Sequence, residues 1–245
     1  MESMDIFESR DKIEEELKRL NDPLLISERA SGNWETNACL NFTFDKWDTY
    51  AEGYRVAGDV LVQHVEKEKR HQDTLVYPIM FLYRQYIELR LKELIKVSGR
   101  LLDKDPKIPQ HHDLMLLWQK VRPNLEAVWS STETKDYHDA AEERLKEFCD
   151  IDRISFAFRY PEDKNGDPTL RGLQHINLSH LSEVMRAISH LLDGSSLGLG
   201  EYLQTKCEMM AEYGDYEQEM RAEMMAEYRQ YEREMMADYY ENEQG

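Results

Sequence analysis

The sequence predicts an all-α protein: a helical bundle with a small aromatic loop or hairpin excursion and a long C-terminal helix. Three observations predict this fold class. Apolar residues recur at steps of three and four from residue 45 to residue 193, no strand-like stretch of comparable weight interrupts them, and a 15-residue motif is repeated near the C-terminus. Side chains three and four positions apart share one face of an α-helix, so we expect amphipathic helices packed around one core.

The composition limits the classes of function. The 245 residues are 41% hydrophobic, which is enough for one sizeable core with appendages. The net charge is −18, and residues 200–245 alone hold 13 acidic and four basic residues, so about half of the excess lies in the last fifth of the chain. Phosphate binding needs clustered lysine and arginine, so this balance argues against a broad nonspecific nucleic-acid surface.

Cysteine usage and the N-terminal segment indicate a protein of the cytoplasm. Cys39, Cys149 and Cys207 are widely spaced and odd in number, which fits neither a disulfide framework nor a zinc site. The start of the chain, MESMDIFESRDK, lacks the basic-then-apolar layout of a signal peptide. No apolar run approaches the roughly 20 residues that span a bilayer. We therefore expect a cytoplasmic protein with no membrane contact, no metal and no cofactor.

The chain divides into three predicted parts. Residues 1–44 form an N-terminal helix and a connecting segment, residues 45–195 form the bundle, and residues 196–245 form a linker and an acidic repeat helix. The first helix, over 4–20, carries a rough apolar stripe, whereas 22–43 has many breakers and no period. The stripe consists of Ile6, Phe7, Ile13, Leu17 and Leu20.

The first two helices of the bundle differ in their expected burial. Residues 75–83 are apolar on nearly every face, which is typical of a helix surrounded by others, and residues 84–96 become amphipathic. Pro78 begins or kinks this central helix, and Ser98 and Gly99 end it. The helix before it has one continuous stripe, made of Trp47, Tyr50, Tyr54, Ala57, Leu61 and His64.

Three further helices complete the predicted bundle. Asp113 is a natural N-cap for a helix that Pro123 interrupts, and residues 132–150 and 177–192 give the other two. The breaker-rich DGSSLGLG follows as the linker. The residues expected to face the core are Leu114, Leu117, Trp118 and Val121, then Tyr137, Ala141, Leu145 and Phe148, then Leu178, Leu181, Val184, Met185, Ile188 and Leu191.

An aromatic segment separates the last two of these helices. ISFAFRYP alternates apolar and other residues, and EDKNGDP supplies an Asn-Gly turn, so we expect an ordered excursion, either a loop or a small hairpin. Arg153, Arg159 and Asp163 fall within it. Loops on a rigid scaffold often carry ligand contacts, which makes these residues candidates for a pocket. The alternative is a flap that covers the core with its phenylalanines, and the sequence leaves both open.

Two segments resemble a known family. They are FLYRQYIELRLKELI, residues 81–95, and, after a loop, HHDLMLLW, residues 111–118. Over about residues 72–192 the chain resembles a HEPN-type bundle, in which a helix of the form ELxLKxLI precedes an HDLxxL helix. The resemblance implies a small bacterial or archaeal α-bundle, usually dimeric, of the kind found in toxin–antitoxin modules, in phage defence and as RNA-cutting effectors.

The nuclease members of that family carry an arginine and a histidine a little over one turn apart on a late helix. That spacing is absent here, and the nearest matches, Arg171 with His175 and Arg186 with His190, are one residue too close. Arg186 and His190 lie on the expected helix and share a face. An atypical metal-independent ribonuclease would use His190 to shuttle a proton and Arg186 to neutralise the phosphate. The other interpretation is that both are ordinary polar residues of the bundle.

Further polar candidates lie around the central helix. Arg84, Glu88 and Lys92 are spaced by four, which predicts a ladder of ion pairs along one face. Arg84 directly follows the apolar run, so we expect it to be partly buried and to need a partner. The triplet at 111–113 resembles a metal cluster, but adjacent side chains point apart and nothing completes a site. His112 remains a candidate for lining a pocket.

The C-terminal segment is a doubled motif. EMMAEYGDYEQEMRA, residues 208–222, is followed directly by EMMAEYRQYEREMMA, residues 223–237. Met and Tyr recur at steps of three and four with a mean period of about 3.75 residues, which is helical and favours a right-handed wrap by a partner. Both side chains are adaptable, and they suit an irregular partner better than a uniquely packed core. The stripe is Met209, Tyr213, Tyr216, Met220, Met224, Tyr228, Tyr231 and Met235, with Tyr239 beyond.

Three interpretations of this helix stay open. It docks on another subunit or a different protein, it packs back on its own bundle, or it is a mobile acidic tail that competes with nucleic acid for a basic partner. We expect a non-catalytic, HEPN-like interaction or assembly protein of a bacterial defence or toxin–antitoxin type of system. It would form a homodimer or higher homo-oligomer, or bind a protein effector. RNA would be a partner only if Arg186 and His190 make it a ribonuclease.

Overall fold

The chain consists of two units. The computed structural model describes the backbone of residues 6–23, 34–40, 43, 46–105 and 107–243, and side chains for 12–23, 35–40, 43, 46–105 and 107–233. Contacts divide the chain into one unit over Met1–Phe44 and another over Asp45–Gly245. Each unit is described by itself below.

The first unit contains one helix of appreciable length. Helix α1 spans Ile6–Lys18 and passes directly into a 3-10 turn, η1, at Arg19–Asn21, which confirms the helix predicted there. A second 3-10 turn, η2, spans Trp34–Thr36. Three members of the predicted stripe are exposed, namely Ile13, Leu17 and Leu20, whereas the side chains of Ile6 and Phe7 and most of the connecting segment lie outside the described residues.

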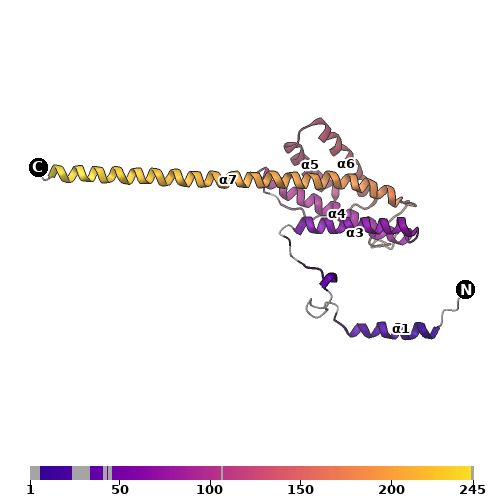
Figure 1. The fold of residues 1–245 in the computed structure, drawn as a ribbon. Coiled ribbons are helices and arrows are strands. Elements are labelled where there is room, and N and C mark those ends of the chain that lie inside the picture. The colour runs from indigo at the N-terminus through magenta and orange to yellow at the C-terminus, as the bar shows by residue number, and fades with distance from the viewer. Residues whose placement is uncertain (1–5, 24–33, 41–42, 44–45, 106, 244–245) are drawn as a thin grey trace. The chain divides into compact units, whose positions relative to one another are not determined.

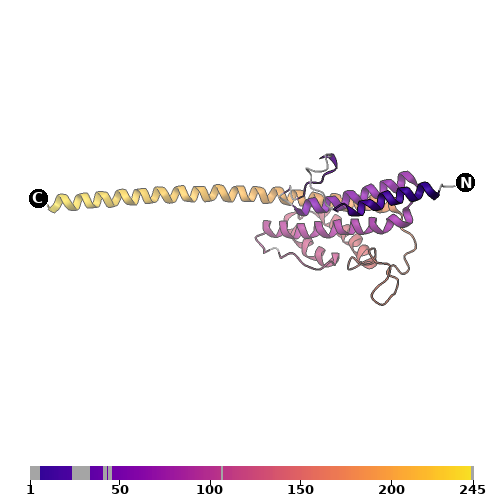
Figure 2. The ribbon, with the colours of Figure 1, turned by 90° about the horizontal axis from the view of Figure 1, so that it is seen from below.

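The second unit is an all-α bundle, as predicted. Its helices are α3 Lys46–Glu68, α4 Gln72–Leu101, α5 Leu114–Val128, α6 Thr132–Ile151 and α7 Leu178–Glu243. Helix α4 lies between α3 and α7 and also contacts α5, while α6 packs on α5 (Figures 1 and 2). No helix among the described residues combines the length and the apolar character that crossing a membrane requires.

Helix α4 is the centre of the core, but its burial differs from the prediction. The expected amphipathic part, residues 84–96, has no broad solvent face, because the helix is almost completely buried from Tyr83 to Gly99. Tyr77 and Pro78, in the supposedly surrounded part, are exposed. Charged residues at helical spacing predict a solvent-facing side, whereas the bundle encloses those of α4 and pairs them internally.

Helix α3 packs through small residues. The residues that it buries completely are Ala51, Gly58 and Val62, whereas Tyr50 and His64 of the predicted stripe are exposed. Gly58 lies against the ring of Tyr83, where an added Cβ would come within 2.8 Å of a ring carbon. The absence of a side chain at Gly58 therefore allows α3 to approach α4 closely. The face of α3 that packs on the bundle is thus a different one from the face predicted from its large apolar residues.

Helix α5 begins and is buried as predicted. The Asp113 carboxylate caps it by accepting hydrogen bonds from the backbone N–H groups of Met115 and Leu116. Pro123 does not interrupt the helix. It lies on the exposed side, and Gln119, whose carbonyl receives no N–H from Pro123, is an exposed residue too. The four residues expected to face the core, Leu114, Leu117, Trp118 and Val121, are all fully buried.

The face of α6 is shifted by one residue from the prediction. Ala141, Leu145 and Phe148 are buried, but Tyr137 is exposed and His138 takes its place in the core. The His138 ring lies edge-on to Trp118, with the ring centres 5.8 Å apart. His138 rather than Tyr137 therefore packs on Trp118.

The aromatic excursion is a loop rather than a regular hairpin. In the part of it that the structure describes, antiparallel pairing is limited to one bridge between Glu162 and Pro168. The Asn-Gly turn is present, since Gly166 has φ +80° and the Asp163 carboxylate accepts from the backbone N–H of Asn165. Phe158 is buried while Ile154 is exposed, so the alternation seen in the sequence does not produce a strand.

Helix α7 continues through the segment predicted as a linker, DGSSLGLG. The Ser195 hydroxyl donates to the Leu191 carbonyl and the Ser196 hydroxyl to Glu93, so these serines bond within the bundle. Gly198 lies against the indole of Trp129, where a Cβ would come within 3.0 Å. The small residues act here as a close-packing surface, and tertiary contacts override their low helix propensity.

Replacing Gly58 with Ala should destabilise the bundle, because the new methyl group meets the buried Tyr83 ring. Overpacking of this kind costs about 1–3 kcal/mol, and the gain in helix propensity offsets about 0.5–1 kcal/mol of it. Gly53 in the same helix has nothing within 4 Å of an added Cβ. Gly53→Ala should raise stability by about 0.5–1 kcal/mol through helix propensity. Urea unfolding measures both, and equal effects of the two substitutions would contradict the packing described.

Candidate functional site

Arg84 is the centre of a buried polar cluster. Its guanidinium group donates to the carbonyl oxygens of Asp152 at 2.9 Å, His112 at 2.7 Å and Arg153 at 2.9 Å, and it contacts the Glu88 carboxylate at 3.3 Å. The side chain is fully buried. It therefore ties α4 to the loop before α5 and to the loop after α6. The sequence predicts that Arg84 is partly buried and paired. The structure confirms the pairing and shows that the side chain is buried completely.

Glu88 lies beside Arg84 and is almost fully buried. Its carboxylate accepts from Lys92 Nζ at 2.8 Å and lies 2.8 Å from His112 Nδ1. Burial by itself would raise the pKa of Glu88, but the hydrogen bonds from Lys92 and His112 outweigh it and hold the pKa below its ordinary value. The His112 side chain is 57% exposed, so one edge of the imidazole faces solvent.

The remaining pocket candidates have structural partners. Arg153 Nε donates to Asp113 at 2.7 Å, although the Arg153 side chain is 71% exposed. Arg159 lies over the rings of Phe81 and Tyr160, each with a distance of 5.7 Å from the guanidinium carbon to the ring centre. The structure thus brings Arg84, Glu88, His112 and Arg153 together as a bond network between elements. Arg153 also lines a hollow with Asp163, and Arg159 lines a neighbouring one.

A second buried network was missed by the sequence interpretation. Arg90 contacts Asp48 of α3 at 2.9 Å, Glu93 at 2.5 Å and Asp193 of α7 at 2.8 Å. The Tyr86 hydroxyl donates to Asp193 at 2.7 Å. This network joins α3, α4 and α7. The sequence signal was the density of charge within an apolar helix, which indicates pairing but does not name distant partners such as Asp48 and Asp193.

The two residues of the ribonuclease hypothesis are both exposed on α7. Burial raises the pKa of the Tyr83 hydroxyl, which donates a hydrogen bond to Asp59 at 2.8 Å. The positive charge of Arg186 acts in the opposite direction and lowers this pKa. His190 lines a hollow between α6 and α7. Arg186 does not line that hollow, and no hollow among the described residues includes both side chains. The ribonuclease activity stays a prediction that the geometry does not strengthen.

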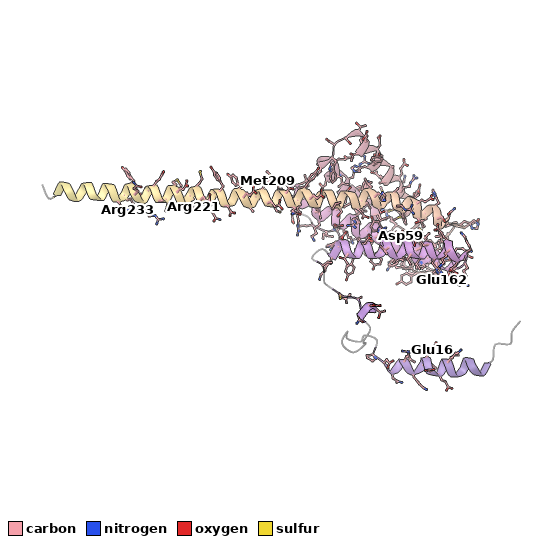
Figure 3. All side chains as sticks on the ribbon, viewed as in Figure 1. Glu16, Asp59, Glu162, Met209, Arg221 and Arg233 are labelled. Atoms are coloured by element: carbon pink, nitrogen blue, oxygen red, sulfur yellow. The ribbon has the colours of Figure 1, made fainter. Side chains whose placement is uncertain are left out.

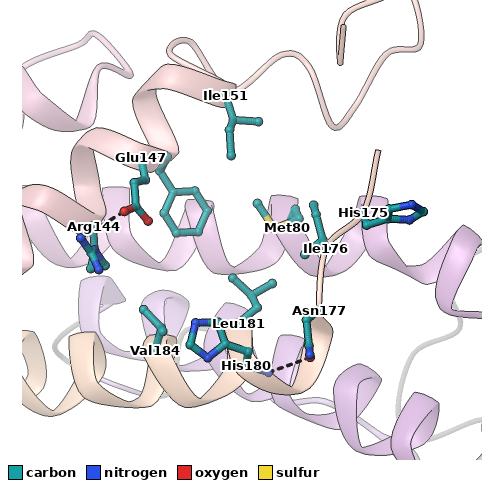
Figure 4. Close-up of a pocket in the computed structure, with 11 residues that line it drawn as sticks. Met80, Arg144, Glu147, Ile151, His175, Ile176, Asn177, His180, Leu181 and Val184 are labelled. Atoms are coloured by element: carbon teal, nitrogen blue, oxygen red, sulfur yellow. Dashed lines mark hydrogen bonds and ion pairs between the residues drawn. The ribbon is translucent and has the colours of Figure 1, made fainter. Parts of the chain in front are cut away.

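An apolar groove runs between α6 and α7. Two adjoining hollows, of about 220 Å³ and 580 Å³, share Arg144 and Val184. Figure 4 shows the smaller one, with Met80 and Leu181 among its apolar residues and Arg144 paired to Glu147 at 3.1 Å. Because its arginine already has a carboxylate partner and most of its lining is apolar, the groove suits a hydrophobic side chain better than a phosphate.

The Met/Tyr stripe is an exposed apolar feature of the second unit. Helix α7 leaves the bundle near Lys206, whose ammonium group donates to the Leu101 carbonyl at 2.8 Å and contacts Asp103 at 2.6 Å. Beyond this point the helix extends away from the bundle as a rod (Figures 1 and 3). The stripe side chains Met209, Tyr213, Tyr216, Met220, Met224, Tyr228 and Tyr231 are 54–69% exposed.

The structure therefore separates the interpretations of the repeat. In the structure the repeat does not pack on its own bundle. Residues 207–233 are all exposed apart from the half-buried Gly214. The helical backbone predicted for the repeat is confirmed and extends to Glu243. Met235 has helical backbone, and its side chain lies outside the described residues.

Neither metal coordination nor a known relative identifies the site. Within the described ranges, no three His, Cys, Asp or Glu side chains are grouped so that they could hold a metal ion. The chain matches no family model, no curated protein and no solved structure. The HEPN resemblance stays a prediction, and the site must be interpreted from its own geometry.

Replacing Arg84 with Met should destabilise the bundle strongly, because it leaves Glu88 without one cation and three carbonyls without their donor. Breaking a buried pair in this way costs about 3–5 kcal/mol. Arg153→Met, which removes an arginine that is 71% exposed, should cost less than about 1 kcal/mol. Denaturant unfolding measures the difference. Similar losses for both variants would contradict a central role for Arg84.

Stability should fall as the pH drops below about 6.5 because of His138. Burial lowers the pKa of this imidazole in the folded chain, so the unfolded chain takes up the proton first and is favoured by acid. His138→Phe should flatten the free energy of unfolding between about pH 7 and pH 5 relative to the unsubstituted chain. An unchanged slope in His138→Phe would contradict this assignment.

Proposed function

We propose that this protein is a non-catalytic interaction protein that uses the projecting part of α7 to assemble with a partner. The observation that carries the proposal is the exposure of the Met/Tyr stripe on a helix that its own bundle does not cover. The buried networks around Arg84 and Arg90 support the other half of the proposal. The charged groups of these networks bond the helices to one another, so they are not free to take part in a catalytic reaction.

The energetics of the rod favour coverage by a partner. A helix without tertiary packing depends on propensity and local pairs alone, and most helices in proteins are stabilised by the burial of an apolar face. Burying a side chain such as Met220 is worth about 1.5–3 kcal/mol, so covering a few members of the stripe would offset the loss of freedom on association. An exposed apolar surface of this length is typical of a protein interaction site.

The base of the rod is rigid enough to transmit an interaction. Between Leu178 and Lys206 the same helix is packed against α4, with Leu192 and Leu199 fully buried and Asp193 bonded to Tyr86. A partner on the rod is therefore connected to the bundle through one continuous helix. For the setting we propose a bacterial defence or toxin–antitoxin type of system, which rests on the resemblance to HEPN bundles alone. The cytoplasmic location that we propose rests on the cysteine usage and the N-terminal sequence instead.

Deletion of residues 207–245 should remove assembly without unfolding the bundle. The free energy of unfolding should change by less than about 0.5 kcal/mol, because Lys206 and its contacts are retained and no deleted side chain with a described position packs on the bundle. The mass measured by light scattering should fall, or a protein that co-purifies with the full chain should be lost. An unchanged mass together with an unchanged set of co-purifying proteins would contradict the proposal.

Substitutions within the rod give a sharper version of this test. Tyr216→Gln with Met220→Gln alters the stripe, whereas Ala211→Gln with Ala222→Gln adds the same polar groups on the opposite side of the helix. Both pairs keep good helix formers. Only the first pair should weaken assembly.

A further inference from the structure

The Met/Tyr stripe is bordered on both sides by glutamates. At about 100° per residue, Glu212 and Glu217 lie about 70° to either side of the stripe centre, and Glu227 and Glu232 occupy the same places in the second repeat. All four are exposed. We call them the border glutamates. The stripe is therefore an apolar ridge with a row of negative charge along each edge.

Of the three arginines of the rod, Arg221 lies beside one edge, because it follows Glu217 by four residues and shares its face. Arg229 and Arg233 lie further round the helix, more than about 100° from the stripe centre. Arg229 Nε donates to the Met225 carbonyl at 3.2 Å, and Arg233 Nε donates to the Arg229 carbonyl at 3.1 Å. The two guanidinium groups are thus engaged along their own side of the rod, and the apolar ridge keeps its acidic borders.

This charge pattern disfavours a second copy of the rod as the partner. When two such rods face each other through their stripes, each edge of one meets an edge of the other. Because both edges carry glutamate, like charges oppose in the parallel and in the antiparallel arrangement, which is destabilising. Nucleic acid and anionic lipid surfaces are disfavoured for the same reason.

We propose that the stripe binds a basic amphipathic helix of another protein, one whose own apolar stripe is bordered on both sides by Lys or Arg. A straight rod offers no concave surface, so a partner that covers the ridge must follow its axis, as a helix does. From Met209 to Tyr231 the ridge is about 33 Å long, which corresponds to a partner helix of about 22 residues. This inference rests on the proposed function and adds the chemistry of the partner.

The probe is a fluorescent synthetic helix of about 25 residues with a Leu stripe bordered by Lys. Two controls accompany it: a peptide of the same composition in scrambled order, and a helix with the same stripe bordered by Glu. Fluorescence anisotropy with the full chain should detect binding of the Lys-bordered helix and at least tenfold weaker binding of both controls. Equal binding of the scrambled peptide would overturn the inference, because it would show attraction by net charge alone.

Variants of the rod locate the contact. Glu212→Gln with Glu217→Gln should weaken binding of the Lys-bordered helix about two- to fivefold, and binding should also decrease with added salt. Asp215→Asn with Glu219→Gln removes the same charge from positions further from the stripe and should change the affinity by less than about twofold. Equal losses in the two variants would contradict a role for the borders.

Light scattering on the same samples separates the two proposals. If the full chain self-associates through residues 207–245 and does not bind the Lys-bordered helix, assembly through the rod stands and the basic partner is wrong. If the chain neither self-associates nor binds this helix, the inference is also overturned. If the chain lacking residues 207–245 binds the helix as tightly as the full chain, the contact is elsewhere and the inference fails.

Discussion

Helix α4 is surrounded by other elements and yet buries five charged side chains, and this constraint organises the bundle. The five are Arg84, Glu88, Arg90, Lys92 and Glu93. A buried charge without a partner is strongly unfavourable, so each neighbouring element must bring compensating groups to α4. Helix α3 brings Asp48, helix α7 brings Asp193, and the loops beside α5 and α6 bring carbonyl oxygens to Arg84. The arrangement of helices around α4 follows from these bonds as much as from its apolar residues.

Close approach of the neighbouring helices is the second requirement, because short polar side chains reach α4 only when the backbones are near. Small residues provide this at Gly58 of α3, against Tyr83, and at Ser196 of α7, which bonds to Glu93. Gly198 allows an equally close approach of α7 to Trp129 at the end of α5. Helix α7 consequently packs in the core of the bundle over its first part and is exposed to solvent beyond Lys206.

The contrast between these two parts of α7 underlies the proposed function. In the bundle, charge is buried and paired, whereas along the rod the apolar residues are exposed and the charge forms their borders. The hollow between α6 and α7 is mostly apolar, and its arginine is paired with Glu147. A doubled motif instead lengthens one contact surface. We propose that the repeat extends an interface in this way.

The sequence by itself determined the all-α class, the position of most helices, the Asp113 cap and the period of the terminal stripe, because these depend on local spacing and on capping chemistry. Only the tertiary structure decided which faces are buried. The shift from Tyr137 to His138, the helical DGSSLGLG segment and the pairing of Arg90 with Asp48 and Asp193 all depend on residues distant in sequence. Local periodicity carries no information about such partners, since propensity is weak compared with packing and with the need to neutralise buried charge.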